Sequence, residues 1–331
     1  MNSPCRMMTD DFQKKIDDYR QWIDQKMLAL VNKNNPAYLY DPIQYVFRGK
    51  GKRLRPILVL LVAEMYLVNK EDVLPAALAV EILHNFSLVH DDIMDQDDLR
   101  HGMPTVYKKW DESTAILAGD AIFVMAYSHL THLHQGALDA IRMFNEATLK
   151  LCEGQAMDKS FETRTDVHID DYLEMITLKT GTLLSLCCQL GGLLGGATED
   201  NLIHLSEFGR YLGQSFQIQD DVLEIFSDAK TMGKSLGSDV ATSKVTYLSC
   251  AARDYDTMAW SELMASLSGK DMESEIIPTL REYMAREGIK SKAESKVEEL
   301  LQKARGELAE VQVSDKSNLI QLAEMILQRR N

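Results

Sequence analysis

The sequence predicts an all-α protein in which residues 1–331 form a single domain. No proline lies between Pro104 and Pro278, and such a span favours helices because helix interiors exclude proline. Apolar residues recur at three- and four-residue spacing in several long stretches, whereas alternating runs of β-branched residues are nearly absent. Length alone would favour two domains, but no linker rich in glycine, serine or proline divides the chain.

Several stretches carry the helical pattern, taken here in chain order. Residues 76–95, AALAVEILHNFSLVHDDIMD, should form a largely buried helix. Residues 112–133 show the same spacing, with Ser113 or Thr114 available as the N-cap. Two further long helices are expected over residues 169–190 and over residues 202–226. From about residue 257 onward we expect an amphipathic helical tail that is rich in charge.

Composition and charge exclude several classes of protein. With 45% hydrophobic and 26% charged residues the chain has a globular composition, and its net charge of −14 argues against a nucleic-acid coat. Residues 180–198 carry no charge, but they contain five glycines, so a buried helix that ends at glycines is a better interpretation than a membrane span. The N-terminus lacks the apolar region of a secretory signal. We therefore expect neither a nucleic-acid partner nor a membrane span.

Cysteines and histidines give no metal-site or disulfide pattern. The five cysteines are odd in number and irregular in spacing, which favours reduced thiols in a cytoplasmic protein. Cys187 and Cys188 are expected to be buried packing residues. The histidines at 129, 132 and 134 lack a Cys or carboxylate at ligand spacing, so a helix end is the better interpretation.

The stretch LVHDDIMDQDDLRHG, residues 88–102, places five aspartates within eight positions. On a helix Asp91 and Asp95 lie one turn apart on one face, with Asp92 about 100° round the axis. Such carboxylates can bind Mg²⁺, which commonly shares a few carboxylates with substrate phosphates. A solvated acidic face is the usual alternative, but apolar residues precede this cluster and unpaired charges there would be costly. Asp97 and Asp98 are expected in the turn beyond the helix.

A second acidic cluster repeats this spacing far along the chain. SFQIQDDVLEIF supplies Asp220, Asp221 and Glu224, again at i, i+1 and i+4 in an apolar helix. Two such clusters predict two acidic walls that face one cavity, where several Mg²⁺ ions would hold a diphosphate.

A polyanionic ligand also needs direct cations. RGKGKRLRP, residues 48–56, provides five cations and two glycines that let the backbone approach a ligand, although a basic surface loop remains an alternative. Further cations follow each acidic cluster: Arg100 and His101 after the first, Lys234 and Lys244 after the second. The pattern predicts two anionic subsites, one bridged by metal and one bound directly.

At this point the sequence resembles the trans-isoprenyl diphosphate synthases, the polyprenyl synthetase family. The matching pieces occur in the family's order and are GKGKRLRP, EILHNFSLVHDDIMDQDDLRHGMPT, AGDAIF, CEGQAMD, KTGTL, FQIQDDVLEIF, GKSLGSD and SKVT. The resemblance implies a helical bundle around a central apolar cavity, the isoprenoid synthase fold, in a homodimer. It also implies that an allylic diphosphate condenses head to tail with isopentenyl diphosphate and releases pyrophosphate.

The resemblance assigns roles to individual residues. The ligands of three Mg²⁺ ions on the allylic diphosphate would be Asp91, Asp92, Asp95, Asp220 and Asp221, with Glu224 at the outer end of its cluster. Residues that bind this diphosphate directly would be Arg100, Lys179 and Lys234, with Lys244 nearby. Isopentenyl diphosphate would be bound by Lys52, Arg55, His84 and, in place of a second arginine, His101. In addition to Lys179, the residues beside the allylic carbon would be Thr180 and Gln217. The same cavity would be lined by Gln155 and Asp158.

Three positions depart from the family's pattern. His101 replaces an arginine, which predicts weaker or pH-sensitive binding of isopentenyl diphosphate. Glu224 replaces the commoner aspartate, and Tyr107 replaces a frequent histidine. None of these changes removes an aspartate of the two clusters, so an active enzyme is expected.

Product length is predicted from the residues just before the first cluster. Phe86 and Ser87 lie five and four residues before Asp91, and by resemblance a bulky residue followed by a small one floors a cavity for geranylgeranyl diphosphate. Farnesyl diphosphate is the next candidate. Phe86 as an ordinary core residue remains an alternative.

Two other functions are compatible with part of the pattern. A class I terpene cyclase shares the aspartate-rich helix and Mg²⁺ but does not need the basic loop, since it binds no second diphosphate. A non-catalytic regulatory subunit of a prenyl synthase would tend to lose aspartates from its motifs, and here both motifs are intact.

Overall fold

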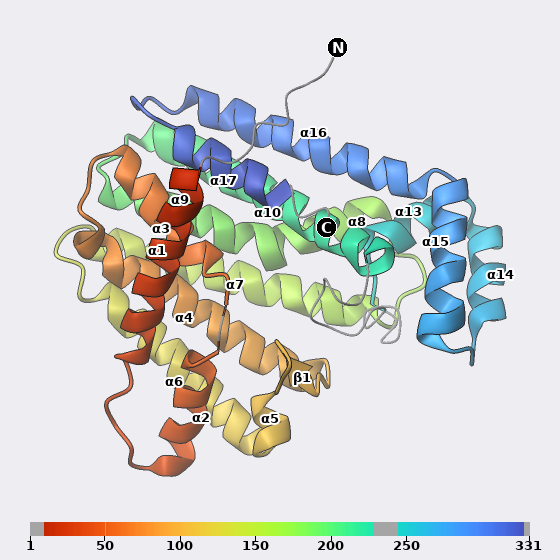
Figure 1. Ribbon diagram of the computed structural model, residues 1–331, viewed down its shortest axis with the longest axis horizontal. Helices are drawn as coiled ribbons and strands as arrows, with labels where there is room; N and C mark the ends of the chain where they lie inside the picture. Colours follow the sequence, from red (N-terminus) through yellow and green to blue (C-terminus); the bar gives the residue numbers. More distant parts are fainter. Residues whose placement is uncertain (1–9, 50, 228–243, 328–331) are drawn as a thin grey trace. The chain divides into compact units, whose positions relative to one another are not determined.

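The computed structural model describes residues 10–49, 51–227 and 244–327, which are helical almost throughout (Figure 1). Within these ranges the only strands are two of two residues each, so the all-α prediction is confirmed. The elements fall into two compact groups, and each group is described by itself.

The first group contains the described residues within Met1–Met143, Cys187–Leu202 and Gln312–Met325. Its helices and strands are α1 (Asp10–Leu28), α2 (Ala37–Phe47), α3 (Leu54–Met65), α4 (Lys70–Met94), β1 (Leu99–Arg100), β2 (Met103–Pro104), α5 (Val106–Lys109), α6 (Glu112–Leu130), the second part of α9 (Thr182–Leu194) and most of α17 (Ser317–Leu327).

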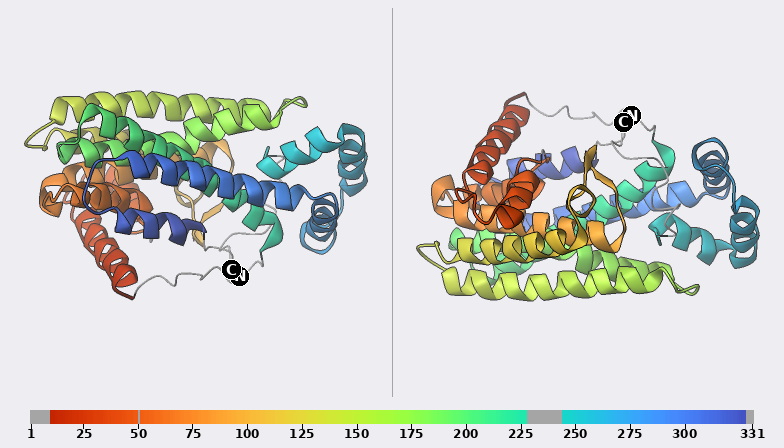
Figure 2. Two further views of the ribbon diagram at one scale, coloured as in Figure 1. Left: turned by 90° about the horizontal axis from the view of Figure 1, so that it is seen from above. Right: turned by 90° about the horizontal axis from the view of Figure 1, so that it is seen from below.

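Helix α4 is the core helix of this group. It begins earlier than the sequence predicted because Asn69 caps it, accepting a hydrogen bond from the backbone N–H of Glu71. It ends at Met94 with Asp95 as its C-cap, so Asp97 and Asp98 follow in the turn, as expected. Thirteen of its residues are buried, and α3 and α6 lie beside it (Figures 1 and 2).

Glycines allow close helix packing in this group. A Cβ on Gly119 of α6 would lie 2.2 Å from the ring of His90, and a Cβ on Gly191 of α9 would lie 2.7 Å from the carbonyl oxygen of Val59. Gly196, at a φ of +72°, follows the end of α9. The uncharged stretch is thus a packed helix that ends at glycines, and Cys187 and Cys188 within it are fully buried, as predicted.

Two details differ from the sequence-based expectation. Neither Ser113 nor Thr114 caps α6, because Asp111 takes this position and accepts a hydrogen bond from the backbone N–H of Thr114 at 2.7 Å. A short hairpin also follows α4, with a two-residue turn in which His101 and Gly102 have φ values of 52° and 75°. Both values are typical of a type I′ turn, the turn that matches the twist of a hairpin.

The second group contains the described residues within Phe144–Leu186, Ile203–Val311 and Ile326–Asn331. Its elements are most of α7 (Ala137–Phe161), α8 (Ile169–Ile176), the π-helical segment η1 (Thr177–Gly181), the first part of α9, most of α10 (Glu199–Phe226), α13 (Tyr247–Tyr255), α14 (Thr257–Leu267), η2 (Met272–Ile276), α15 (Ile277–Arg286) and α16 (Ile289–Glu310).

The predicted helix over residues 169–190 is interrupted by the π turn η1. Two glycines allow neighbouring backbones to approach it: a Cβ on Gly154 of α7 would lie 2.4 Å from the backbone nitrogen of Lys179, and a Cβ on Gly213 of α10 would lie 2.6 Å from the Cα of Gly181. Single π turns often occur at functional sites. The segment that breaks the regular helix is the one that carries Lys179 and Thr180.

The C-terminal tail is helical, as predicted. Trp260 of α14 and Tyr283 of α15 pack with ring centroids 6.0 Å apart. Helices α14 and α15 lie near the start of α16 (Figure 2). Helix α16 buries one apolar face and exposes its charged residues. By length and composition α4 and α6 would both be able to cross a membrane, but core helices pass the same test, and two-thirds of the α4 window (67%) is buried in the protein.

Candidate active site

The first aspartate cluster lies at the C-terminal end of α4. Asp92 is buried, whereas Asp91 and Asp95 are half-buried. Burial raises the pKa of Asp92 to about 6, although Arg100 lowers it through a charge interaction and a hydrogen bond. Arg100 Nε lies 2.5 Å from Asp92 Oδ1, and Arg100 Nη2 lies 3.2 Å from Asp97 Oδ2. The hairpin after α4 therefore places the cation of Arg100 against Asp92, the buried member of the cluster.

The basic loop is fixed by Arg53, whose side chain is buried although its neighbours Lys52 and Arg55 are more exposed. Its guanidinium donates to Glu81 of α4 and to Asp24 of α1, both at 2.7 Å. Arg53 also has a φ of 50° and is the N-cap of α3. A buried ion pair with several hydrogen bonds thus fixes the junction between the loop and α3, on either side of which lie the predicted substrate-binding cations Lys52 and Arg55.

His84 lies on α4 within electrostatic reach of a cationic cluster, which consists of Arg53, Arg55, Arg100 and His101. Burial lowers its pKa well below the usual range, and the charges of Arg55, Arg100, Arg53 and His101 lower it further. The imidazole is therefore neutral at neutral pH. The structure brings together the predicted residues His84, Arg55, Arg100 and His101 from α3, α4 and the hairpin, and it places the exposed His101 side chain at the turn.

Phe86 and Ser87 differ in what their side chains contact. The Phe86 ring is half-buried and packs against Phe123 of α6 and His90, with centroids 5.1 and 4.8 Å apart. The Ser87 hydroxyl is buried and donates to the carbonyl oxygen of His84 at 2.9 Å. Of the two side chains, Phe86 is the bulky one that lies between helices.

The second aspartate cluster lies near the C-terminal end of α10, and its first two residues repeat the burial pattern of Asp91 and Asp92. Asp220 is half-buried, whereas Asp221 and Glu224 are buried. Asp221 Oδ2 accepts hydrogen bonds from the hydroxyl of Tyr172 at 2.5 Å and from the backbone N–H of Tyr247 at 2.8 Å. In both clusters the second aspartate is therefore buried and accepts hydrogen bonds from donors on other elements.

The π turn presents Lys179 and Thr180 to this network. Lys179 Nζ lies 2.5 Å from Asp158 Oδ2 of α7, and the hydroxyl of Thr180 donates to Gln217 Oε1 at 3.1 Å. Gln217 Nε2 in turn donates to Asp221 Oδ1 at 3.3 Å. The residues predicted beside the allylic carbon are thus gathered around the π turn.

Gln155 of α7 belongs to the same group of elements and is only 7% exposed. In the described part of the chain neither of its amide atoms has a hydrogen-bond partner. A buried amide in this state costs free energy, which a polar ligand would recover. This observation supports the expectation that Gln155 lines the substrate site.

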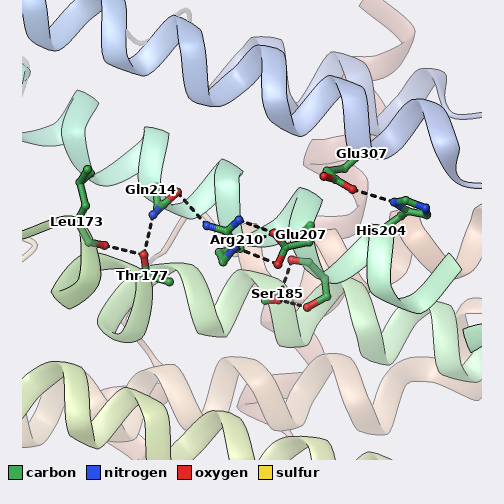
Figure 3. Close-up of polar contacts among 9 residues, drawn as sticks. Leu173, Thr177, Ser185, His204, Glu207, Arg210, Gln214 and Glu307 are labelled. Atoms are coloured by element: carbon green, nitrogen blue, oxygen red, sulfur yellow. Dashed lines mark hydrogen bonds and ion pairs between the residues drawn. The ribbon is translucent and has the colours of Figure 1, made fainter. Parts of the chain in front are cut away.

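A chain of polar contacts holds the π turn from the side of α10 (Figure 3). Thr177, the first residue of the turn, donates to the carbonyl oxygen of Leu173 and accepts from Gln214 Nε2, both at 2.6 Å. Gln214 is buried, and its Oε1 accepts from Arg210 at 3.4 Å. Arg210 is fixed in turn by Glu207. Sequence analysis missed Gln214, whose role depends on a contact between two helices.

The donor set fits Mg²⁺, because both clusters offer carboxylate oxygens on helices that are partly out of water. Among the described residues no three His, Cys, Asp or Glu side chains form a ready-made metal cage. Mg²⁺ usually keeps waters and takes further ligands from substrate phosphates, so one or two carboxylates per ion suffice. Lys244 is half-buried just before α13, and Lys234 lies outside the described residues.

Known proteins resemble this chain in sequence and in fold. The profile of the polyprenyl synthetase family matches residues 36–284. The geranylgeranyl diphosphate synthase of Methanosarcina mazei is 40% identical over 245 residues, 73% of this chain and 76% of that protein. The corresponding enzyme of Saccharolobus solfataricus is 38% identical over 98% of this chain and all of its own length. The crystal structure of the geranylgeranyl pyrophosphate synthetase of Pyrococcus horikoshii superposes with a TM-score of 0.89 at 32% identity, over 96% of this chain and 98% of that one.

The helical architecture and the structural relatives define an enzyme with the isoprenoid synthase fold. The paired aspartates and the lysine–threonine turn lie within the residues that the family profile matches. This chain belongs to the polyprenyl synthetase family and is a trans-prenyltransferase.

Because Gln214 contacts Thr177 in the π turn, we expect its loss to slow turnover. Gln214→Leu should lower kcat by about tenfold, because a shift of about 1 Å in a positioned group can cost up to ~100-fold. KM for either substrate should change less. Steady-state kinetics with both substrates would measure the split.

Ser185→Ala is the matched control, since Ser185 of α9 bonds to Ser206 of α10 at 2.7 Å without touching the π turn. It should cost about 1 kcal/mol of stability and leave kcat unchanged. A wild-type kcat in Gln214→Leu would show that the polar chain is purely structural.

Proposed function

We propose that this enzyme makes geranylgeranyl diphosphate by condensing an allylic diphosphate head to tail with isopentenyl diphosphate, releasing pyrophosphate. The observation that carries the proposal is the cationic cluster around the neutral His84. A cyclase needs no such second anion site. The assignment of the product rests on the similarity to relatives that are geranylgeranyl diphosphate synthases.

In this proposal the clusters Asp91/Asp92/Asp95 and Asp220/Asp221/Glu224 hold three Mg²⁺ ions. Bound Mg²⁺ would neutralise the leaving diphosphate as the allylic C–O bond breaks. The half-buried Asp91, Asp95 and Asp220 are the more accessible carboxylates, whereas Asp92 and Asp221 are held by Arg100 and Tyr172.

Lys179, Arg100, Lys234 and Lys244 would add direct cations to the allylic diphosphate. Positive charges that are already positioned where negative charge develops lower the activation barrier, because the protein does not have to reorganise during the reaction. Lys52, Arg55, His84 and His101 would orient the isopentenyl diphosphate. These assignments rest on the resemblance, and the proximity of His84, Arg55, Arg100 and His101 supports them.

The positive charge on the allylic carbon needs oxygen dipoles and the exclusion of water. Thr180 is buried and its hydroxyl donates to Gln217, which leaves the oxygen lone pairs of Thr180 able to face a cation. The alkene of isopentenyl diphosphate would form the new C–C bond to this carbon, and the resulting carbocation would lose a proton to the departing pyrophosphate. The protein therefore needs no base of its own.

We further propose a homodimer that works in the cytoplasm without a membrane span or nucleic acid. Helix α6 leaves three large apolar side chains exposed, Ile116, Leu117 and Val124. A surface helix that exposes this much apolar area is typical of a protein interface.

The reaction itself is the first test of the proposal. With Mg²⁺, farnesyl diphosphate and isopentenyl diphosphate, the protein should release pyrophosphate and form a C20 diphosphate, identified by mass spectrometry. Pyrophosphate release without isopentenyl diphosphate would indicate a cyclase, and no release at all would indicate a silent subunit. A C15 product from shorter primers would make it a farnesyl diphosphate synthase.

His101 should make the affinity for isopentenyl diphosphate depend on pH. A histidine side chain loses its positive charge as pH rises between about 5 and 8, so KM should increase by up to about tenfold across this range. In His101→Arg the charge persists and KM should vary less. Equal pH profiles of KM in the two proteins would exclude His101 from this site.

Phe86 should limit the length of the product. Phe86→Ala removes the ring that packs against Phe123, and the product should grow by at least one five-carbon unit. Phe86→Tyr keeps a ring at this position and should keep the C20 product. An unchanged chain length in Phe86→Ala would mean that another residue forms the floor.

The dimer interface can be tested at Val124, which is 64% exposed. Val124→Asp should halve the mass measured by light scattering, from twice 37.5 kDa to that of one chain, because a buried carboxylate in an interface is costly. Leu67, which is 90% exposed outside α6, provides the control. Leu67→Asp should leave the dimer intact, and a dimeric Val124→Asp would place the interface elsewhere.

A further inference from the structure

Tyr172 is a buried polar residue for which sequence analysis assigned no role. It lies on α8, seven residues before Lys179, and its side chain is 1% exposed. Its hydroxyl lies 2.5 Å from Oδ2 of Asp221 on α10. Because a carboxylate oxygen can only accept, the Tyr172 hydroxyl is the donor in this contact.

A second donor reaches the same oxygen from another helix. The backbone N–H of Tyr247, the first residue of α13, lies 2.8 Å from Asp221 Oδ2. A carboxylate oxygen offers about two lone-pair directions, and these two donors suffice to occupy them. The carboxylate is thereby fixed between α8 and α13 and cannot rotate without losing a buried hydrogen bond.

The opposite oxygen of Asp221 faces the reactive part of the site. Oδ1 accepts from Gln217 at 3.3 Å, and Gln217 in turn accepts from Thr180 at 3.1 Å. The orientation of this one carboxylate is consequently coupled to the π turn. A rotation of Asp221 would displace the amide of Gln217 as well.

We propose that Tyr172 is a positioning residue for the metal site: it holds Oδ2 of Asp221 so that Oδ1 is presented to a divalent cation. This inference rests on the proposed function, in which Asp221 is a Mg²⁺ ligand. Groups that hydrogen-bond to metal-ligating carboxylates orient them, and their loss typically weakens metal binding by about 10- to 100-fold.

A purely structural role would give a different result. The Tyr172 ring packs edge-on against Tyr247 with centroids 6.2 Å apart, and phenylalanine would keep this packing. Tyr172→Phe therefore removes the hydroxyl alone. If the hydroxyl acts only on stability, metal affinity should not change in the folded protein.

Metal affinity can be measured without turnover, using Mn²⁺ in the presence of inorganic pyrophosphate and the electron paramagnetic resonance signal of free Mn²⁺. Tyr172→Phe should weaken Mn²⁺ binding by about tenfold or more. Tyr19→Phe is the matched control, because Tyr19 also bonds a carboxylate, that of Glu64, but on α1 and α3. Its Mn²⁺ affinity should equal that of the wild type.

A double-mutant comparison tests whether Tyr172 acts through Asp221. In an Asp221→Asn background, Tyr172→Phe should produce no further loss of Mn²⁺ affinity. In kinetics, Tyr172→Phe should raise the Mg²⁺ concentration for half-maximal activity and leave KM for isopentenyl diphosphate unchanged. Wild-type Mn²⁺ affinity in Tyr172→Phe, or the same loss in the Asp221→Asn background, would overturn the proposal.

Two further measurements keep the outcomes separate. If Tyr172→Phe does not fold, 4-aminophenylalanine at this position keeps the ring and an N–H donor, and should restore folding and Mn²⁺ affinity together. A folded 4-aminophenylalanine protein with weak Mn²⁺ binding would contradict the role of the donor. A wild-type protein that binds Mn²⁺ but forms no prenyl product would refute the proposed function and leave the positioning role standing.

Discussion

A carboxylate removed from water needs a partner, and this constraint determines the arrangement of both groups of helices. Glu81 is paired with Arg53, Asp92 with Arg100, Asp158 with Lys179, and Asp221 with Tyr172 and the backbone of Tyr247. In each pair the donor comes from a different element than the acid. Within each group, these acidic residues therefore connect neighbouring elements.

The cationic cluster differs from these pairs, because several cations act on one imidazole there. Burial lowers the pKa of His84 well below its ordinary value, and the charges of Arg55, Arg100, Arg53 and His101 lower it further. A neutral imidazole can donate one hydrogen bond and accept another, whereas a charged one would only donate. His84 thus suits a site in which the arginines supply the positive charge and the histidine supplies hydrogen bonds in defined directions.

Much of this arrangement could be predicted from the sequence because it is local. Periodicity located α4 and α10, and the spacing of the aspartates placed each cluster on a helix. The remainder depends on contacts between distant segments. The cap of α6 at Asp111, the π turn near Lys179 and the bonds of Tyr172 and Gln214 follow from packing, and single-residue patterns carry no signal for them.

The π turn has a geometric consequence for the helices on either side. Each residue of an α-helix advances by about 100°, and a π turn accommodates one extra residue within the same helical path. Helices α8 and α9 can therefore both keep their apolar faces buried, although the segment between them is one residue out of phase. Within the offset segment the polar residue Thr180 is buried, and its hydroxyl meets Gln217 of α10.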